Sequence, residues 1–241
     1  MEENFGVIFK KSYDLLLKNI KAFSIVYAIF FVPTTVLVLL GVGSFKLLQT
    51  ADAGPSGLSV LISAIIFILT ILISLFYSIA LIKTVHNVAQ DQSVNAVEMY
   101  KQAKDIFSPF AIVSILVFVK VILWSLLLIV PGIIFSVLYG FSSYSVIIDD
   151  KRGNEALAFS KSVIKSNLKE FLLKMFALMG AMILAAILIS LVSAFFILIP
   201  FIGVAVGTIA SEVVKAALGI YALIFSYYLY QDLKNKTVAQ I

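Results

Sequence analysis

The sequence contains no cysteine and a single histidine, His86. Without cysteine there is no disulfide framework, thiolate metal site or cysteine nucleophile. One histidine argues against a zinc or di-metal hydrolase centre, because such centres combine several nitrogen or sulfur ligands with carboxylates. A Walker A loop, a dinucleotide fingerprint and a Gly-x-Ser-x-Gly elbow are also missing. We therefore expect a protein that is not an enzyme and holds neither metal nor cofactor.

Charged residues are scarce as well. They make up 13% of the 241 residues, against 62% hydrophobic residues and a mean hydropathy of +1.10. This leaves too little polar surface to coat a soluble globule. Six apolar segments reach the length of about 20 residues that a bilayer-spanning helix needs: 22–45, 59–82, 110–130, 132–148, 171–199 and 212–230. We expect an all-α polytopic membrane protein with one integral membrane domain over residues 1–241.

The basic residues indicate the orientation. Six spans would place residues 1–21, 83–109, 149–170 and the tail after residue 230 on one side of the membrane. Together with Lys174, these segments hold fifteen of the eighteen Lys and Arg residues. The positive-inside rule makes that side the cytoplasm. We expect a multi-pass protein of the inner (plasma) membrane with both termini cytoplasmic, and a first span that serves as its own insertion signal.

A unit of sequence occurs three times. The copies cover roughly residues 4–83, 95–150 and 154–233 and begin at Asn4, Asn95 and Asn154. Each has an amphipathic segment followed by two apolar spans, which predicts three hairpins, each preceded by a cytoplasmic interfacial helix. The same segments are also explained as connecting helices. The first two copies align Phe5, Ile8, Phe9, Ser12, Leu15 and Leu16 with Ala96, Met99, Tyr100, Ala103, Ile106 and Phe107.

The middle of the chain has a recognisable series of short motifs. They are Val130-Pro131-Gly132-Ile133-Ile134, Val146-Ile147-Ile148-Asp149-Asp150, Gly153-Asn154-Glu155-Ala156-Leu157 and Ser160-Lys161-Ser162. This pattern resembles a bacterial and archaeal six-helix membrane domain that is fused to some glycerophosphoryl diester phosphodiesterases and also has stand-alone integral membrane relatives. The resemblance implies a membrane location. The catalytic domain is missing from this sequence, so hydrolase activity is not implied.

Cations of the third copy are candidates for lipid binding. Lys161, Lys165 and Lys169 recur at four-residue intervals near Arg152. Juxtamembrane basic residues attract anionic headgroups with about 1 kcal/mol each. We expect Asp149 and Asp150 to be solvated. The tyrosines of the last span, namely Tyr221, Tyr227, Tyr228 and Tyr230, predict an interfacial aromatic belt.

Ionisable residues inside spans form a second set of candidates. Lys120 falls near the middle of the third span, where charge is costly, and Trp124 is one helical turn away. Glu212 and Lys215 have the spacing of a local ion pair, although Glu212 could instead reach Lys120. The alternative for Lys120 is a structural role, packed against Ser136, Tyr139 and Ser143 of the next span.

We therefore expect a non-enzymatic membrane protein that interacts with anionic lipids or with a partner membrane protein. A homo-oligomer fits equally well, whereas nucleic acid does not, because the lysines lie along membrane-parallel segments. The alternative is a small transporter or channel-like permease with a midplane site near Lys120. Repeats of parallel topology do occur in transporters.

The predicted orientation is tested by cysteine labelling, since the sequence has no cysteine of its own. An impermeant maleimide applied to intact cells should label Ser56→Cys, in the first predicted outer loop, and spare Ser162→Cys. The opposite labelling pattern would show that the positive-inside assignment is inverted.

Overall fold

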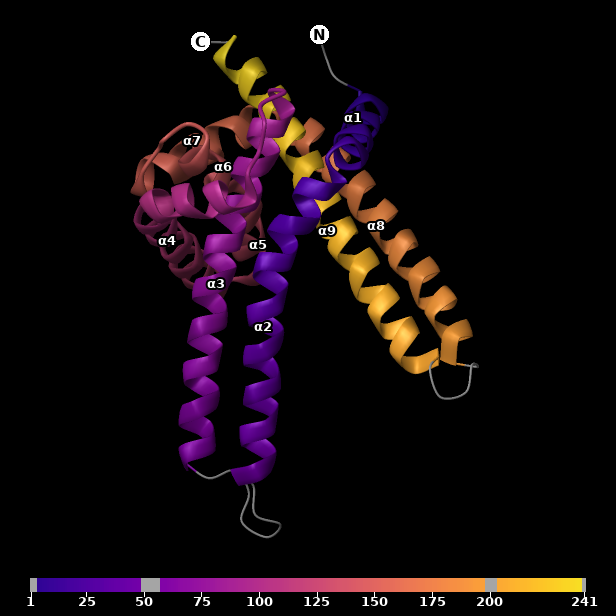
Figure 1. Cartoon of the computed structure of the whole chain (residues 1–241). Helices are drawn as coiled ribbons and strands as arrows, with labels where there is room; N and C mark the ends of the chain where they lie inside the picture. The colour runs from indigo at the N-terminus through magenta and orange to yellow at the C-terminus, as the bar shows by residue number, and fades with distance from the viewer. Residues whose placement is uncertain (1–3, 49–56, 198–202, 240–241) are drawn as a thin grey trace. The chain divides into compact units, whose positions relative to one another are not determined.

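The computed structural model describes residues 4–48, 57–197 and 203–239. The predicted outer loop around Ser56 lies outside these residues. The described part is helical and contains no strand (Figure 1). Its helices are α1 (Phe5–Lys18), α2 (Ile20–Leu48), α3 (Gly57–Ala89), α4 (Ala96–Leu127), α5 (Ile129–Leu138), α6 (Ser142–Ile147), α7 (Gly153–Ser166), α8 (Leu168–Ile197) and α9 (Gly203–Val238).

Six stretches of helix are long and apolar enough to cross a membrane. Most of their apolar side chains lie on the outside of the protein, where only an apolar solvent can cover them. The chain is therefore an integral membrane protein. The candidate spans are Ile20–Leu40, Gly57–Ala89, Ala96–Leu127, Ile129–Ile147, Leu168–Phe196 and Ala210–Val238.

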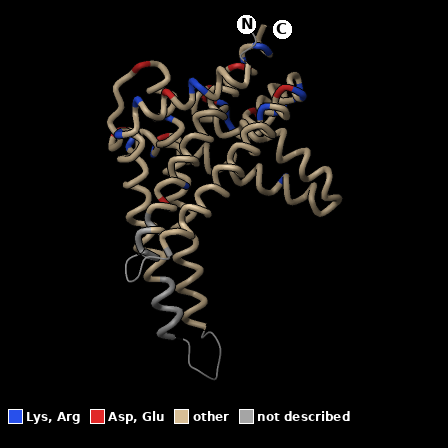
Figure 2. Tube along the Cα trace, turned by 90° about the vertical axis from the view of Figure 1, so that its right-hand side faces the viewer, with Lys and Arg blue, Asp and Glu red and all other residues tan. Residues whose placement is uncertain are grey.

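The chain forms two compact units. The smaller comprises Ile20–Ile112 and holds α2, α3 and the first half of α4. Phe30 of α2 stacks on Tyr77 of α3, with ring centroids 4.3 Å apart. Tyr100 of α4 donates a hydrogen bond of 2.9 Å to the Val26 carbonyl oxygen. No charged residue occurs between Lys21 and Lys46 of α2 or between Gly57 and Lys83 of α3, and most charges of this unit lie at the end of the helix pair that holds Lys21 and Lys83 (Figure 2).

The larger unit comprises Met1–Asn19 and Val113–Ile241, and α9 is its central helix. α9 packs against α8, α1 and α7. Phe5 of α1 lies 5.4 Å from Phe225 of α9, and Tyr221 donates a hydrogen bond to the Phe9 carbonyl oxygen. Protein contacts cover the apolar face of α7, so this face is not free to enter the bilayer. Its covered residues are Ala156, Leu157, Val163 and Ile164.

Asparagine residues follow the ends of α1 and α7. Asn19 and Asn167 each donate a hydrogen bond of 3.1 Å to the carbonyl oxygen four residues earlier. Such a bond competes with the helical ladder, and both residues leave helical dihedrals. In the predicted second copy, Phe110 corresponds to Asn19, and α4 continues through it. The segment that begins α4 is therefore continuous with the candidate span that follows it.

The fourth candidate span is broken between α5 and α6. Ser160 of α7, which is fully buried, satisfies the backbone at this break. Its hydroxyl accepts a hydrogen bond of 3.0 Å from the Phe141 amide and donates one of 2.9 Å to the Leu138 carbonyl oxygen. Broken backbone inside a membrane protein needs such internal partners, because hydrocarbon offers none.

Replacing Ser160 should therefore destabilise the larger unit. Ser160→Ala removes the side-chain partner of two buried backbone groups, which should cost about 1–3 kcal/mol. The matched control is Ser162→Ala on the exposed face of the same helix, with an expected cost below about 0.5 kcal/mol. Thermal unfolding in detergent measures both, and equal melting temperatures would contradict this role of Ser160.

Candidate functional site

Three aromatic rings of α4 and α5 form a continuous stack in the larger unit. Trp124 stacks on Phe135 with ring centroids 4.5 Å apart and an interplanar angle of 16°. Phe135 in turn lies 5.7 Å from Tyr139, whose ring is tilted by 34° relative to it. Tyr139, the residue that caps α5, lies beside Phe135 because the two are four residues apart. The stack therefore joins the two arms of the α4–α5 hairpin.

Two lysine ammonium groups lie over this stack. Lys120 Nζ is 5.9 Å from the Tyr139 ring centroid and donates a hydrogen bond of 2.7 Å to Asn154 Oδ1 of α7. Lys161 Nζ, from α7, is 5.6 Å from the Phe135 centroid. Both contacts are within the range of a cation–π interaction. We call this group the Lys120 cluster: Lys120, Trp124, Phe135, Tyr139, Asn154 and Lys161.

The Lys120 cluster carries uncompensated positive charge. Within residues 4–48, 57–197 and 203–239, neither Lys120 nor Lys161 has a carboxylate partner. Asn154, Lys161 and Lys165 share one exposed face of α7, since they are seven and four residues apart. Lys165 therefore extends the positive surface along the helix.

An apolar hollow adjoins the cluster. It has a volume of about 510 Å³ and is lined by Lys120, Leu123, Trp124, Leu126 and Leu127 of α4. A charged group at one end and a leucine-lined wall at the other suit an amphiphile. The structure thus brings Lys120, Trp124 and Lys161 together, although the sequence assigned them to two separate sets.

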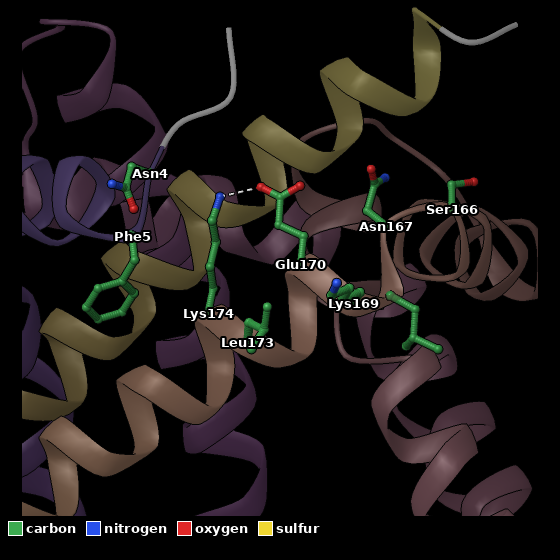
Figure 3. Close-up of a pocket in the computed structure, with 9 residues that line it drawn as sticks. Asn4, Phe5, Ser166, Asn167, Lys169, Glu170, Leu173 and Lys174 are labelled. Carbon is green, nitrogen blue, oxygen red and sulfur yellow. Dashed lines mark hydrogen bonds and ion pairs between the residues drawn. The ribbon is translucent and has the colours of Figure 1, made fainter.

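The other predicted residues lie elsewhere. Glu212 and Lys215 form the expected local pair, with 2.8 Å between Nζ and Oε1, so this pairing is confirmed. Arg152 is exposed and lies 3.6 Å from Asp150. Lys169 lines a second cavity of about 750 Å³ at the junction of α7 and α8 (Figure 3). The neighbouring Lys151 donates a hydrogen bond to Glu155, which raises the pKa of Lys151.

A buried ion-pair network, which the sequence did not predict, joins α8 to α9. Lys174 Nζ lies 2.5 Å from Glu170 Oε1 and 2.9 Å from Asp232 Oδ2. Figure 3 shows Lys174 and Glu170 pointing toward one another. Lys236 closes the network at 2.6 Å from Glu170 and 3.3 Å from Asp232. The i, i+4 spacings of Glu170 with Lys174 and of Asp232 with Lys236 were its signals in the sequence.

The structure contradicts two predictions, namely that Asp149 is solvated and that the tyrosines of the last span form an interfacial belt. The Asp149 carboxylate accepts hydrogen bonds from Tyr230 and Lys234 of α9, and its side chain is only 12% exposed. The prediction that Asp149 is solvated is wrong, whereas Asp150 is 87% exposed. Tyr221, Tyr227 and Tyr230 are buried, so they belong to the core and not to a lipid-facing belt. Stacking of Tyr230 on Tyr144, at 5.4 Å, explains this burial.

Within the described residues, no group of three His, Cys, Asp or Glu side chains is arranged to hold a metal ion. His86 of α3 lies 3.1 Å from the Gln90 amide. A comparison of the sequence with protein family models gives no match. Comparisons with curated proteins and with solved structures also give none. The functional argument therefore depends on the geometry of the site.

Breaking the buried network should be costly. Asp232→Ala leaves Lys174, whose side chain is 8% exposed, without one of its two carboxylates, and should lower the free energy of unfolding by about 3 kcal/mol. The control Glu212→Gln breaks an exposed pair and should cost at most about 1 kcal/mol. The double variant Lys174→Met with Asp232→Leu should recover most of the loss. If Asp232→Ala unfolds like the control, the network does not hold α8 to α9.

Proposed function

We propose that this integral membrane protein binds the anionic headgroup of a membrane lipid at the Lys120 cluster and catalyses no reaction. One observation carries the proposal. Lys120 and Lys161 hold two ammonium groups against an aromatic stack, and neither has a carboxylate partner in the described part of the chain. Positive charge that the protein leaves unbalanced beside an apolar surface attracts a phosphate.

The geometry at Lys120 favours a phosphate oxygen as its second partner. A lysine ammonium has three N–H donors, and Asn154 Oδ1 accepts one of them. The remaining donors can serve a ligand without disturbing this bond. Asn154 also lies in the first turn of α7, where the helix dipole adds positive potential. Asn154 therefore acts as a positioning residue for the Lys120 ammonium.

The apolar side of the site favours a lipid over a free anion. Leu123, Leu126 and Leu127 line the hollow beside Lys120, and all three are exposed on the surface of the hairpin. Acyl chains would cover them and gain the free energy of apolar contact that a small soluble anion cannot provide. Lys165, on the same face of α7, would interact with the outer part of the headgroup.

The orientation of the site follows from the charge rule. We propose that the Lys120 cluster faces the cytoplasmic leaflet, which contains anionic lipids, because the basic residues of α7 lie on the predicted cytoplasmic side. The arrangement in three hairpins with cytoplasmic interfacial helices is part of this proposal. The relationship to the membrane domain of glycerophosphoryl diester phosphodiesterases stays a prediction, as do a partner membrane protein and a homo-oligomer.

Lipid retention tests the proposal. The double variant Lys120→Gln with Lys161→Gln should retain phosphatidylglycerol at least about tenfold more weakly, because two lysines contribute about 1 kcal/mol each near an anionic surface. Native mass spectrometry in detergent measures retention, with phosphatidylcholine as the zwitterionic reference of zero net charge. The matched control is Lys101→Gln with Lys104→Gln, two exposed lysines of α4 outside the cluster. Equal retention by both double variants would contradict the proposal.

The transporter alternative is distinguished by a thermal-shift screen. Wild type and Lys120→Met are compared against lipids, organic anions and nucleotides, since a ligand raises the melting temperature of the state that binds it. A rise with anionic lipid that is lost in Lys120→Met supports the headgroup site. A rise with a soluble anion, and none with lipid, would favour a transport site instead.

A further inference from the structure

We infer that the α4–α5 hairpin enters a single leaflet and that its apex ends near the bilayer midplane, with acyl chains of that leaflet around it. The inference goes beyond the proposed function, because it concerns the depth of the hairpin and not the headgroup at its base. Its starting point is α7, which defines a polar level in the larger unit. The charges of α7 and of the turn before it are Asp149, Asp150, Lys151, Arg152, Glu155, Lys161 and Lys165.

α7 must stay at the headgroup level. Placing so many charged side chains within hydrocarbon is strongly unfavourable. Its buried face packs on protein, and its exposed face bears Lys161 and Lys165. Helix α7 therefore marks the boundary between the headgroups and the hydrocarbon core.

Both arms of the hairpin are held at this boundary. Lys120 of α4 is hydrogen-bonded to Asn154, near the start of α7. Phe135 of α5 lies under the Lys161 ammonium, 5.6 Å away. The two arms thus contact the same helix, one near its start at Asn154 and the other seven residues further along at Lys161. The depth of the hairpin depends only on what lies beyond Lys120 and Phe135.

The part of the hairpin that extends beyond its two contacts with α7, at Lys120 and Phe135, is short. Seven residues separate Lys120 from the end of α4 at Leu127, and six separate Phe135 from the start of α5 at Ile129. At 1.5 Å per residue, the hairpin extends about 10 Å past these contacts. An extended lysine side chain adds on the order of 6 Å, which brings the apex to about 16 Å. A hydrocarbon core is about 30 Å thick, so the apex ends near its middle.

The turn itself has the properties of a segment inside hydrocarbon. Its five residues, Leu126 to Val130, are each 66–78% exposed and all apolar. At an outer headgroup layer these side chains would face water. Inside the bilayer they face acyl chains. The turn therefore lacks the polar residues that a loop at a membrane surface would carry.

Two backbone hydrogen bonds close the turn. The Leu128 amide donates to the Trp124 carbonyl oxygen at 3.0 Å, and the Gly132 amide donates to the Leu128 carbonyl oxygen at 3.3 Å. Pro131 has no amide proton that would need a partner. Gly132 also lets the arms approach, since a side-chain carbon there would lie 2.9 Å from the Ser125 Cα. Each of these features reduces the number of backbone donors that hydrocarbon would leave unpaired.

This arrangement leaves the predicted position of the termini unchanged. A hairpin that enters and leaves through the same leaflet returns the chain to the side from which it came, as two complete crossings would. The difference is confined to the position of the apex. In the six-crossing arrangement the turn at Ile129 would reach the outer surface, and here it stays within the bilayer.

Single-cysteine labelling tests the depth in the full-length protein, which has no cysteine of its own. Ile129→Cys in proteoliposomes should react with impermeant maleimide, from either side, at less than about a tenth of the rate of Ser162→Cys, because the reagent does not enter hydrocarbon. Val130→Cys is the second variant, in case Ile129→Cys folds poorly. Fast labelling of these apex variants from the side opposite Ser162→Cys, or from the same side, would overturn the inference.

Depth-dependent quenching gives an independent readout. A fluorophore on Ile129→Cys should be quenched most by lipids brominated near the ends of their acyl chains, and least by lipids brominated near the headgroup. The reverse order would overturn the inference. Failure of the lipid-binding proposal would appear differently, as unchanged lipid retention in the Lys120 and Lys161 variants, and would leave the quenching order as it is.

Discussion

The structure depends on one constraint, which is that apolar surroundings offer no hydrogen bonds to the backbone. Helices meet this constraint within each segment, which is why the described residues contain helices and no strand. Where helices end, polar side chains form hydrogen bonds with the backbone groups that the helix leaves unpaired. Ser160 satisfies the break between α5 and α6, and Asn167 donates to carbonyl oxygens of both α7 and α9. Without these polar side chains, the breaks that redirect the chain would leave buried donors and acceptors unpaired.

The charges of the larger unit fall into two kinds. Glu170, Lys174, Asp232 and Lys236 alternate in sign and neutralise one another, so their role is to hold α8 against α9. The Lys120 cluster has cations without matching anions. A balanced network leaves no charge for a ligand to neutralise, whereas the cations of the Lys120 cluster are unbalanced beside an apolar hollow. This contrast, and not the number of lysines, is why we propose the Lys120 cluster as the headgroup site.

The junctions between consecutive helices differ along the chain. Asn19 separates α1 from α2 and Asn167 separates α7 from α8, whereas α4 continues through Phe110. The helices also differ in length. α8 runs for 30 residues, whereas α5 has 10 and is followed by a break. The predicted repeat pattern therefore does not determine where each helix ends.

The sequence by itself determined the features that depend on composition and on neighbours along one helix. The apolar spans and the Glu212–Lys215 pair are of this kind, because length, hydropathy and i, i+3 spacing are local properties. Only the tertiary structure decided which distant groups meet. Lys174 is hydrogen-bonded to Asp232, at a sequence separation of 58 residues. Lys120 is hydrogen-bonded to Asn154, at a separation of 34 residues. The membrane-spanning helices are apolar on nearly every side, so the sequence does not indicate which side of each helix faces the protein interior. Tertiary packing sets the rotation of each of these helices about its axis. It thereby determines that Tyr230 and Asp149 are buried.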